Sequence, residues 1–341
     1  MDPLTHILLG ANLSYAAFGR RLGRAAAGVG ALAAFAPDAD VFIRSAADPL
    51  LAIEHHRGFT HAFAFTPIGA GIVASLWLFS PSWRNRRRWL QLWCAAMLAY
   101  LSHMLLDAAT TYGTQLLWPF SRARTGWDVI AIIDPPFTLV LLIALIVALV
   151  RQRLRSTIIG LSLCSAYVIF GIIQHARALA AQRTLAESRG HVVERTEVMP
   201  TLANNVVWRA LYLHSGKIHA DRIRVGWFSG TTVREGWSMP LVTRADLTAG
   251  EAARNERQAF ERFAWFSDQW VGRSPSDATI LADMRYTLSA EAFDPIWGIR
   301  FTAPGSATNV EWINRSRDRK IDIAGMWEEI RGRDPRYRPL K

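Results

Sequence analysis

Three histidines lie within seven residues of this chain. Residues 55–61 read His-His-Arg-Gly-Phe-Thr-His, and an apolar run follows them at once. Hydrophobic packing gives no reason to place three polar imidazoles so close together. A helix cap at Thr60 would account for the threonine but not for the histidines. Because neutral imidazole is a common ligand of transition metals, the stretch predicts a metal site.

A second candidate pair, His103 and Asp107, lies within an apolar segment further along the chain. Their i, i+4 spacing places both side chains on one face of a helix. Ionisable groups in an apolar membrane helix are costly, so they indicate function. Two interpretations stay open. Either both residues bind metal, or Asp107 only orients the imidazole of His103.

Imidazole and carboxylate side chains also occur at His6 and in the Pro-Asp-Ala-Asp sequence at residues 37–40. The predicted metal ligands are His6, Asp38, Asp40, His56, His61, His103 and Asp107. This mixture of nitrogen and oxygen donors suits a divalent transition metal, and we expect zinc, with manganese or iron as alternatives. Calcium and magnesium are not expected, because they prefer shells made of oxygen alone. Cys94 and Cys164 both lie in apolar runs, so we expect no thiolate ligand.

A donor set of this kind is typical of hydrolysis. Two divalent ions about 3.5–4 Å apart can share a carboxylate and stabilise both the attacking and the leaving oxygen of a phosphoester. We expect Asp38 and Asp107 to be catalytic carboxylates and Arg57 to bind a phosphate oxygen. The alternative for Arg57 is a surface arginine at the level of the lipid headgroups.

The candidate residues lie among apolar segments that indicate a membrane protein. The 341 residues are 51% hydrophobic and 20% charged, which is more apolar than an average soluble protein. Apolar runs cover residues 7–18, 25–36, 62–79, 90–106, 137–150 and 157–173. Some are shorter than the roughly 20 residues of a typical span. Their succession, with basic loops between them, favours membrane spans over core helices of a soluble protein.

The arginines between these segments predict an orientation. Ten arginines fall in loops on one side of the membrane and four in loops on the other. The ten are Arg20, Arg21, Arg24, Arg84, Arg86, Arg87, Arg88, Arg151, Arg153 and Arg155. The positive-inside rule places the ten in the cytoplasm. All predicted ligands then lie near the extracytoplasmic face. The net charge of +11 is explained by topology, so no nucleic-acid partner is expected.

The chain changes character after residue 175. Strand-like pieces at residues 205–212, 223–228 and 296–301, and a helical stretch at 251–270, predict a soluble α+β domain over 176–341. Residues 1–175 are predicted to form a mostly α, membrane-embedded helical metallohydrolase domain. The last span would deliver the second domain to the extracytoplasmic side. We expect its aromatic residues to form a core and its histidines to be structural.

Several motifs in order resemble a known family. Asp-Pro-Leu-Thr-His at 2–6, Pro-Asp-Ala-Asp at 37–40, His-Arg-Gly-Phe-Thr-His at 56–61 and His-Met-Leu-Leu-Asp at 103–107, followed by Thr-Thr-Tyr-Gly-Thr at 110–114, resemble the YdjM-like inner-membrane metal-dependent hydrolases over about residues 1–175. The resemblance implies a multi-pass protein of the bacterial inner membrane.

The order of these motifs is also similar to zinc-dependent phospholipase C and the related single-strand nucleases. That similarity implies, as metal ligands, His6, Asp38, His56 or His61, His103 and Asp107. Gly113 stands about where those enzymes have a further histidine, so the third metal of their sites is not expected here.

We therefore expect a membrane-bound hydrolase whose di-metal site cleaves phosphoester bonds in membrane lipids or envelope precursors. The alternative is a non-catalytic, metal-stabilised membrane scaffold or binding protein. The two differ in the metal shell: a catalytic ion keeps an open position, whereas a structural ion is saturated by protein ligands.

Overall fold

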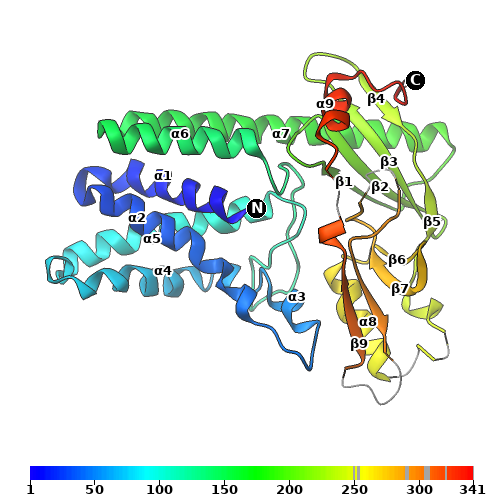
Figure 1. The fold of residues 1–341 in the computed structure, drawn as a ribbon, viewed down its shortest axis with the longest axis horizontal. Helices are drawn as coiled ribbons and strands as arrows, with labels where there is room; N and C mark the ends of the chain where they lie inside the picture. Colours follow the sequence, from blue (N-terminus) through cyan, green and yellow to red (C-terminus); the bar gives the residue numbers. More distant parts are fainter. Residues whose placement is uncertain (249, 252–253, 289–291, 303–307, 319–320, 341) are drawn as a thin grey trace. The chain divides into compact units, whose positions relative to one another are not determined.

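The computed structural model describes residues 1–248, 250–251, 254–288, 292–302, 308–318 and 321–340. Its chain divides into two compact units (Figure 1). The first unit comprises Met1–Phe42 and His55–Ile173, and the second comprises Ile43–Glu54 and Gln174–Lys341.

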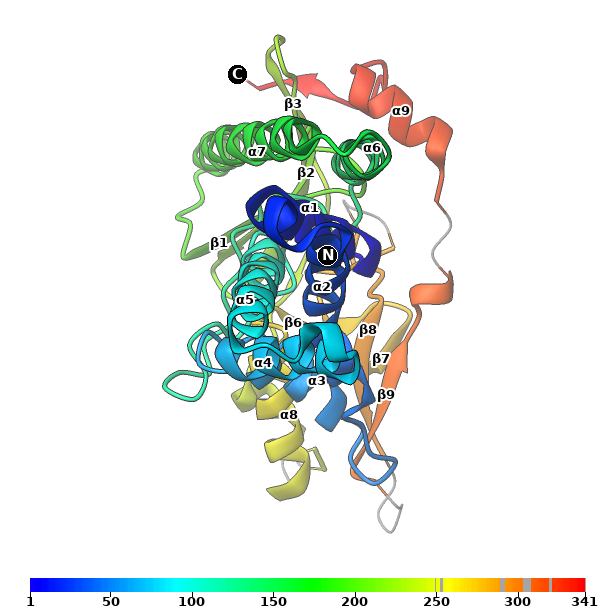
Figure 2. The same ribbon diagram turned by 90° about the vertical axis from the view of Figure 1, so that its left-hand side faces the viewer.

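The first unit is a helical bundle. Its α-helices are α1 (Pro3–Leu22), α2 (Arg24–Phe35), α4 (Thr66–Ser75), α5 (Arg86–Ala108), α6 (Pro135–Arg151) and the first part of α7 (Leu154–Ser188). Short 3₁₀ helices η1 (Ala36–Phe42), η2 (Phe59–His61), η3 (Leu76–Phe79) and η4 (Pro81–Trp83) lie between them. Helix α3 (Leu51–His55), which precedes η2 in the chain, belongs to the second unit except for His55. Seen nearly end-on in Figure 2, α1 packs between α6 and the pair α2 and α5.

Local sequence explains where these helices begin. The Asp2 carboxylate accepts a hydrogen bond from the Thr5 backbone N–H, and Pro3 occupies the first turn of α1. Asp134 accepts from the backbone N–H of Phe137 in the same way at the start of α6. An acidic cap accepts a hydrogen bond from one free N–H group at a helix start, and proline has no N–H group to satisfy. The local sequence therefore explains where these helices begin.

Small residues let the helices of the bundle approach closely. A Cβ atom added to Gly10 in α1 would lie 2.6 Å from the carbonyl oxygen of Gly30 in α2. On α5, Ala95, Ala96 and Ala99 are fully buried. Contacts between small residues are typical of helix packing in membranes, where neighbouring helices gain no hydrophobic free energy by leaving lipid.

Large apolar side chains cover the outside of the bundle. Among those more than half exposed are Ile68, Ile72, Leu139, Ile143, Ile146, Ile158, Ile159, Leu163 and Ile169. An apolar outer surface of this size is unfavourable in water and suits lipid.

Three helices of the described chain are long and apolar enough to cross a membrane: Arg24–Phe42, Arg86–Ala108 and Leu154–Ser188. The pair Leu51–His61 and Thr66–Phe79, bent by 80°, would make a fourth if it forms one broken span. Pro135–Arg151 is apolar but shorter. The prediction of a mostly helical, apolar N-terminal region is therefore confirmed.

The second unit contains two antiparallel sheets. One has the strand order β1 (Arg195–Pro200), β2 (Val207–His214), β3 (Lys217–Val225), β4 (Thr231–Arg234) and β10 (Arg338–Pro339), with β5 (Ser238–Pro240) also paired to β3. The other has the order β6 (Val271–Ser274), β7 (Asp277–Asp283), β8 (Trp297–Phe301) and β9 (Val310–Asn314). The described part of this unit also contains the end of α7, helices α8 (Arg254–Phe266) and α9 (Ile323–Arg331), and 3₁₀ helices η5 (Arg244–Asp246) and η6 (Ser316–Asp318).

Hydrophobic cores join helices to both sheets. Ala178, Ala181 and Leu185 of α7 pack in one cluster with Trp208 and Ile223 of the first sheet. In the second sheet, the rings of Trp297 and Trp312 contact Phe266 of α8. The prediction that the aromatic residues of this region form a core is confirmed for Phe260, Phe263 and Trp270, which are at most 3% exposed.

The predicted strand at residues 223–228 is wrong in its second half. Strand β3 ends at Val225. At this point side chains of α7 bind the backbone: Gln174 donates to the carbonyl oxygen of Val225 and Arg177 to that of Gly226.

Residues 43–54 belong to the second unit, although the sequence suggested one domain over residues 1–175. Arg262 in α8 holds this segment with paired hydrogen bonds. Its guanidinium donates to both carboxylate oxygens of Asp48, at 3.1 and 2.8 Å, and to both of Glu54, at 2.9 and 2.8 Å. Such forked contacts are the strongest form of arginine–carboxylate pairing.

Candidate metal site

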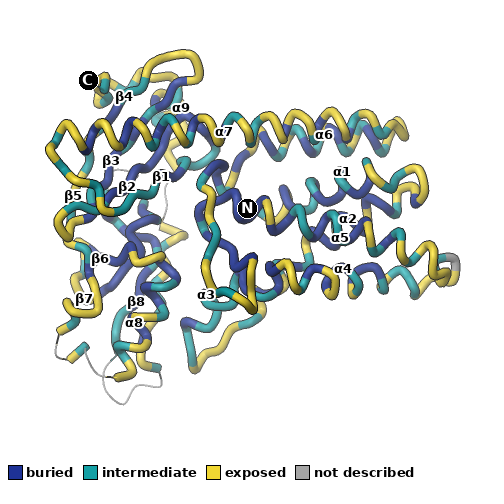
Figure 3. Tube along the Cα trace, turned by 180° about the vertical axis from the view of Figure 1, so that it is seen from behind, coloured by how far each residue is buried: buried dark blue, intermediate teal, exposed yellow. Residues whose placement is uncertain are grey.

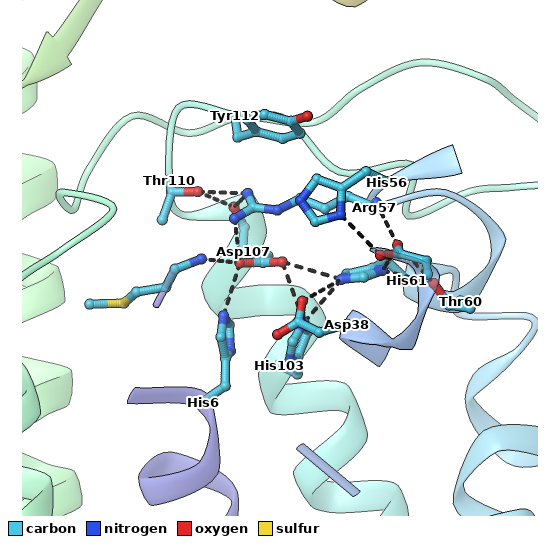
Figure 4. Close-up of polar contacts among 12 residues, drawn as sticks. His6, Asp38, His56, Arg57, Thr60, His61, His103, Asp107, Thr110 and Tyr112 are labelled. Carbon is cyan, nitrogen blue, oxygen red and sulfur yellow. Dashed lines mark hydrogen bonds and ion pairs between the residues drawn. The ribbon is translucent and has the colours of Figure 1, made fainter. Parts of the chain in front are cut away.

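Four ligand-type side chains converge at one end of the helical bundle (Figure 4). Asp38 comes from η1, His61 from η2, and His103 and Asp107 from the last two turns of α5. One ligand atom from each lies within 4.8 Å of the others, close enough to surround a single ion. The side chains of His61, His103 and Asp107 are 0–1% exposed.

The distances show which atoms face the centre. His61 Nε2 and His103 Nε2 lie 3.0 Å apart. Each lies 3.4 Å from Asp107 Oδ2. The Asp38 Oδ1 atom lies 3.7 Å from the His61 nitrogen and 3.6 Å from the His103 nitrogen. Two imidazole nitrogens and two carboxylate oxygens thus point at one another.

The far nitrogen of each of these rings has a partner that fixes its role. His103 Nδ1 lies 2.6 Å from the carbonyl oxygen of Ala34. A carbonyl only accepts, so Nδ1 carries the proton and Nε2 keeps its lone pair. His61 Nδ1 lies 3.2 Å from Asp40 Oδ2. Partners of this kind orient metal-binding imidazoles and raise their basicity.

Asp40 and His56, two of the predicted ligands, lie beside the group of four. His56 Nδ1 is 2.9 Å from Asp40 Oδ1, and the backbone N–H of Arg57 donates to Asp40 Oδ2 at 2.7 Å. The hydroxyl of Thr60 donates to the same oxygen. In this arrangement Asp40 organises residues 56–61 around its carboxylate.

His6, the remaining predicted ligand, contacts the other oxygen of Asp107. Its Nε2 atom lies 3.0 Å from Asp107 Oδ1, and its ring stacks on that of His103 with centroids 3.7 Å apart. His6 Nδ1 and Asp107 Oδ2 are buried without a hydrogen-bond partner among the described residues. Asp107 therefore has one oxygen toward His6 and the other toward His61 and His103.

Arg57 is buried at 5% exposure and ion-paired, so it is not the surface arginine considered as its alternative. One guanidinium nitrogen lies 2.9 Å from Asp107 Oδ1, and the other donates to the Thr110 hydroxyl at 3.0 Å. The guanidinium also lies over the ring of Tyr112, 4.8 Å from its centroid. The backbone of Arg57 has a φ of 58°, an unusual left-handed conformation for a non-glycine residue.

Several members of the site carry no clear sequence signal. The Ala34 carbonyl that contacts His103 is a backbone group, and an alanine in the sequence does not indicate such a contact. The α-amino group of Met1 also contacts Asp107 Oδ1. Thr110 and Tyr112 could have been found, because they stand in the polar Thr-Thr-Tyr-Gly-Thr stretch directly after the metal-ligand motif.

The backbone conformation at position 113 explains why this stretch has a glycine there. Its φ is 84°, and an added Cβ would lie 3.0 Å from the Cβ of Arg124. A histidine at this position would be strained, which accounts for the glycine in physical terms.

Comparison with known proteins gives the family. The model of a family described as "YdjM inner membrane protein" matches residues 1–178. The chain belongs to the YdjM inner membrane protein family. The resemblance seen in the sequence motifs is confirmed, and every predicted site residue falls inside the matched region.

Two curated relatives of this YdjM family member are similar over shorter stretches. "Uncharacterized protein YfhP" of Bacillus subtilis (strain 168) is 34% identical over 101 residues, which is 29% of each chain. "Inner membrane protein YbcI" of Escherichia coli (strain K12) is 35% identical over 114 residues, covering 32% of this chain and 62% of the relative. The chain thus spans less than two thirds of either relative. No solved structure matches.

Proposed function

We propose that this protein is a membrane-bound, metal-dependent hydrolase of phosphoester bonds. The observation that carries the proposal is the convergence of His61 Nε2, His103 Nε2, Asp38 and Asp107 in a buried group at the end of an apolar bundle. Buried ionisable groups are costly without a compensating charge. Arg57 and the Met1 amino group contact Asp107 Oδ1, and a divalent cation would supply the compensation on the other side, for Asp107 Oδ2 and Asp38.

The donors fit a transition metal. Two imidazoles with their far nitrogens hydrogen-bonded, and two carboxylates, make a shell that suits zinc, with manganese or iron as alternatives. His6 is the candidate ligand of a second ion, and it lies beside Asp107 Oδ1, which Arg57 and the Met1 amino group also contact. When bound, such ions polarise a phosphoryl oxygen and lower the pKa of water.

Asp38 marks the side from which a substrate would enter. Its side chain is 15% exposed, whereas those of His61, His103 and Asp107 are 0–1% exposed. A catalytic ion needs an open coordination position, and the exposed side of Asp38 is where water or substrate would reach it.

Arg57 is suited to bind a phosphate oxygen. Its two terminal nitrogens contact Asp107 and Thr110, while its Nε is buried without a hydrogen-bond partner among the described residues. An unused N–H beside the metal donors would stabilise a negatively charged oxygen. The ion pair with Asp107 would hold the guanidinium in place.

The arginine distribution supports a site at the extracytoplasmic face. A substrate must then reach the outer leaflet of the inner membrane, so we propose a membrane lipid or a lipid-linked envelope precursor. The C-terminal unit would lie on the same side.

The test uses protein purified in detergent and loaded with zinc or manganese. We expect chelator-sensitive release of phosphate or headgroup from at least one of a panel of lipid and nucleotide phosphoesters. Asp38→Asn should abolish it, because the amide keeps the shape but loses the charge that binds a cation. His55→Ala is the matched control, since His55 lies in the same stretch but outside the site.

The alternative function, a metal-stabilised scaffold or binding protein, predicts a different result. In that case the metal-loaded protein would cleave none of the panel, while chelation would still lower its thermal stability.

A further inference from the structure

A short loop in the second unit carries two adjacent aromatic side chains that face outward. It joins β3, which ends at Val225, to β4, which begins at Thr231. Phe228 in this loop is 100% exposed and Trp227 is 52% exposed. In Figure 3 the tube next to β4 carries the colour of exposed residues along this loop. Two neighbouring aromatic side chains in water lose the hydrophobic free energy that burial would provide. We therefore expect a binding partner or a membrane to cover them.

The loop is fastened to α7 where the apolar part of that helix ends. Gln174 Nε2 donates to the Val225 carbonyl at 2.9 Å, and Arg177 donates to the Gly226 carbonyl, also at 2.9 Å. A second nitrogen of Arg177 donates to the Ser229 carbonyl at 3.4 Å. The loop therefore sits at the level of the helical turn from residue 174 to 177.

That turn lies where α7 would leave the bilayer. No charged residue occurs in α7 between Arg155 and Arg177. The apolar run of residues 157–173, at about 1.5 Å per residue, spans about 25 Å, close to the roughly 30 Å hydrocarbon core. Gln174 and Arg177, and with them the loop, would then lie at the depth of the lipid headgroups.

Helix α9, whose C-terminal end is joined to this loop, carries more exposed apolar side chains. Arg224 donates to the Ser229 hydroxyl at 3.4 Å and to the carbonyl oxygens of Glu329 and Ile330 at 2.9 and 3.0 Å. One side chain thus joins the loop to the end of α9. On the same helix Ile323 and Trp327, one turn apart, are 76% and 53% exposed.

We propose that Trp227, Phe228, Ile323 and Trp327 form an interfacial surface that inserts into the headgroup region of the membrane that α7 crosses. Tryptophan suits this depth because its ring is apolar and its N–H is polar. The Trp227 Nε1–H already donates to Asn205 Oδ1 at 3.0 Å, so the ring can enter the interface without an unsatisfied donor. The insertion would hold the second unit against the bilayer surface.

The test places one spin label per molecule on the full-length protein in lipid nanodiscs. Cys94 and Cys164 are first replaced by alanine, and the label is attached at Phe228→Cys or at Trp237→Cys. Trp237 is the matched control, because it is an exposed aromatic residue of the same unit, 70% exposed, outside the interfacial surface. Collision rates with oxygen, which concentrates in lipid, and with a water-soluble nickel complex are measured at both positions.

We expect the label at 228 to collide several-fold more with oxygen, and several-fold less with nickel, than the label at 237. Equal access of nickel to both labels would overturn the proposal. Dipolar broadening at 228, with no gain in oxygen collisions, would also overturn it and would identify a second copy of the chain as the occupant. Neither label replaces a buried side chain, so both variants should fold.

Discussion

The Nδ1 atom of His103 lies 2.6 Å from the carbonyl oxygen of Ala34, and this contact determines which nitrogen faces the candidate metal site. Because the carbonyl can only accept, the proton is held on Nδ1 and the lone pair of Nε2 points at His61, Asp38 and Asp107. A backbone oxygen of α2, which directly precedes the 3₁₀ helix bearing Asp38, thus determines the tautomer of a candidate ligand on α5.

The first prediction concerns metal content. His103→Ala and Asp107→Ala should each remove at least one tightly bound transition metal, because each deletes a donor of the convergent group. Elemental analysis of protein purified in detergent measures the loss, with His55→Ala retaining the wild-type content. If both variants keep all their metal, the site is wrong as assigned.

A second prediction separates ligands from orienting residues. Asp40→Asn should weaken metal affinity by about 10–100-fold without abolishing binding, as expected for a partner that only orients a ligand. Asp38→Asn should lose binding far more severely, since Asp38 Oδ1 faces both Nε2 atoms. Competition with a chelator of known affinity gives both values. Equal losses would mean that Asp40 is itself a ligand.

The third prediction concerns topology. Reporters inserted in the loop at residues 84–88 and in the loop at 151–155 should report the cytoplasm, because these loops carry seven of the ten arginines on that side. A reporter after Lys341 should report the opposite side. A cytoplasmic signal there, with the other two reporters as expected, would mean that the apolar segment at residues 157–173 does not span.

A fourth prediction concerns stability in acid. His219 stacks on Tyr212 with ring centroids 4.7 Å apart, and His191 and His214 lie next to it. Burial, His191 and Arg189 lower the pKa of His219 to about 4. Between pH 6.5 and 4 the unfolded chain therefore binds a proton that the folded chain does not. The stability of the second unit should fall as the pH drops through this window.

His219→Phe tests that dependence, because phenylalanine keeps the stacking on Tyr212 but does not titrate. The variant should lose less stability than the wild type when chemical denaturation at pH 7 is compared with denaturation at pH 5. The pKa of His191 is also lowered by burial and by His214, so part of the acid sensitivity should remain. An identical pH dependence in both proteins would contradict the assignment.

Much of the site could be predicted from the sequence because its residue types are rare in apolar surroundings. The His103–Asp107 spacing, the Pro-Asp-Ala-Asp step and the histidine-rich stretch each stand out, and the structure brings all three together with His6. The role of each residue within this set was harder to predict from the sequence. Nothing in the sequence distinguishes Asp38, which faces the two Nε2 atoms, from Asp40, which accepts from residues 56–61. That difference depends on the direction of each side chain along a single 3₁₀ turn.

The fold, too, could be predicted only in part from the sequence. Apolar runs and proline-preceded caps locate the helices, because these signals are local. The assignment of residues 43–54 to the second unit was not accessible, because it depends on Arg262, more than 200 residues away in the chain. The hydrogen bonds that Gln174 and Arg177 of α7 make at the end of β3 likewise join residues about 50 positions apart, and no local pattern indicates them.

The attachment of residues 43–54 to α8 also determines how this protein can be divided. The backbone passes from one unit to the other after Phe42, after Glu54 and after Ile173, so no single cut separates them. A fragment ending near residue 175 would keep Asp48 and Glu54 but lose Arg262, their shared cation. Two carboxylates would then repel each other on a short tether between Asp40 and His56. Work on the metal site therefore needs the whole chain, even though every candidate ligand lies in its first third.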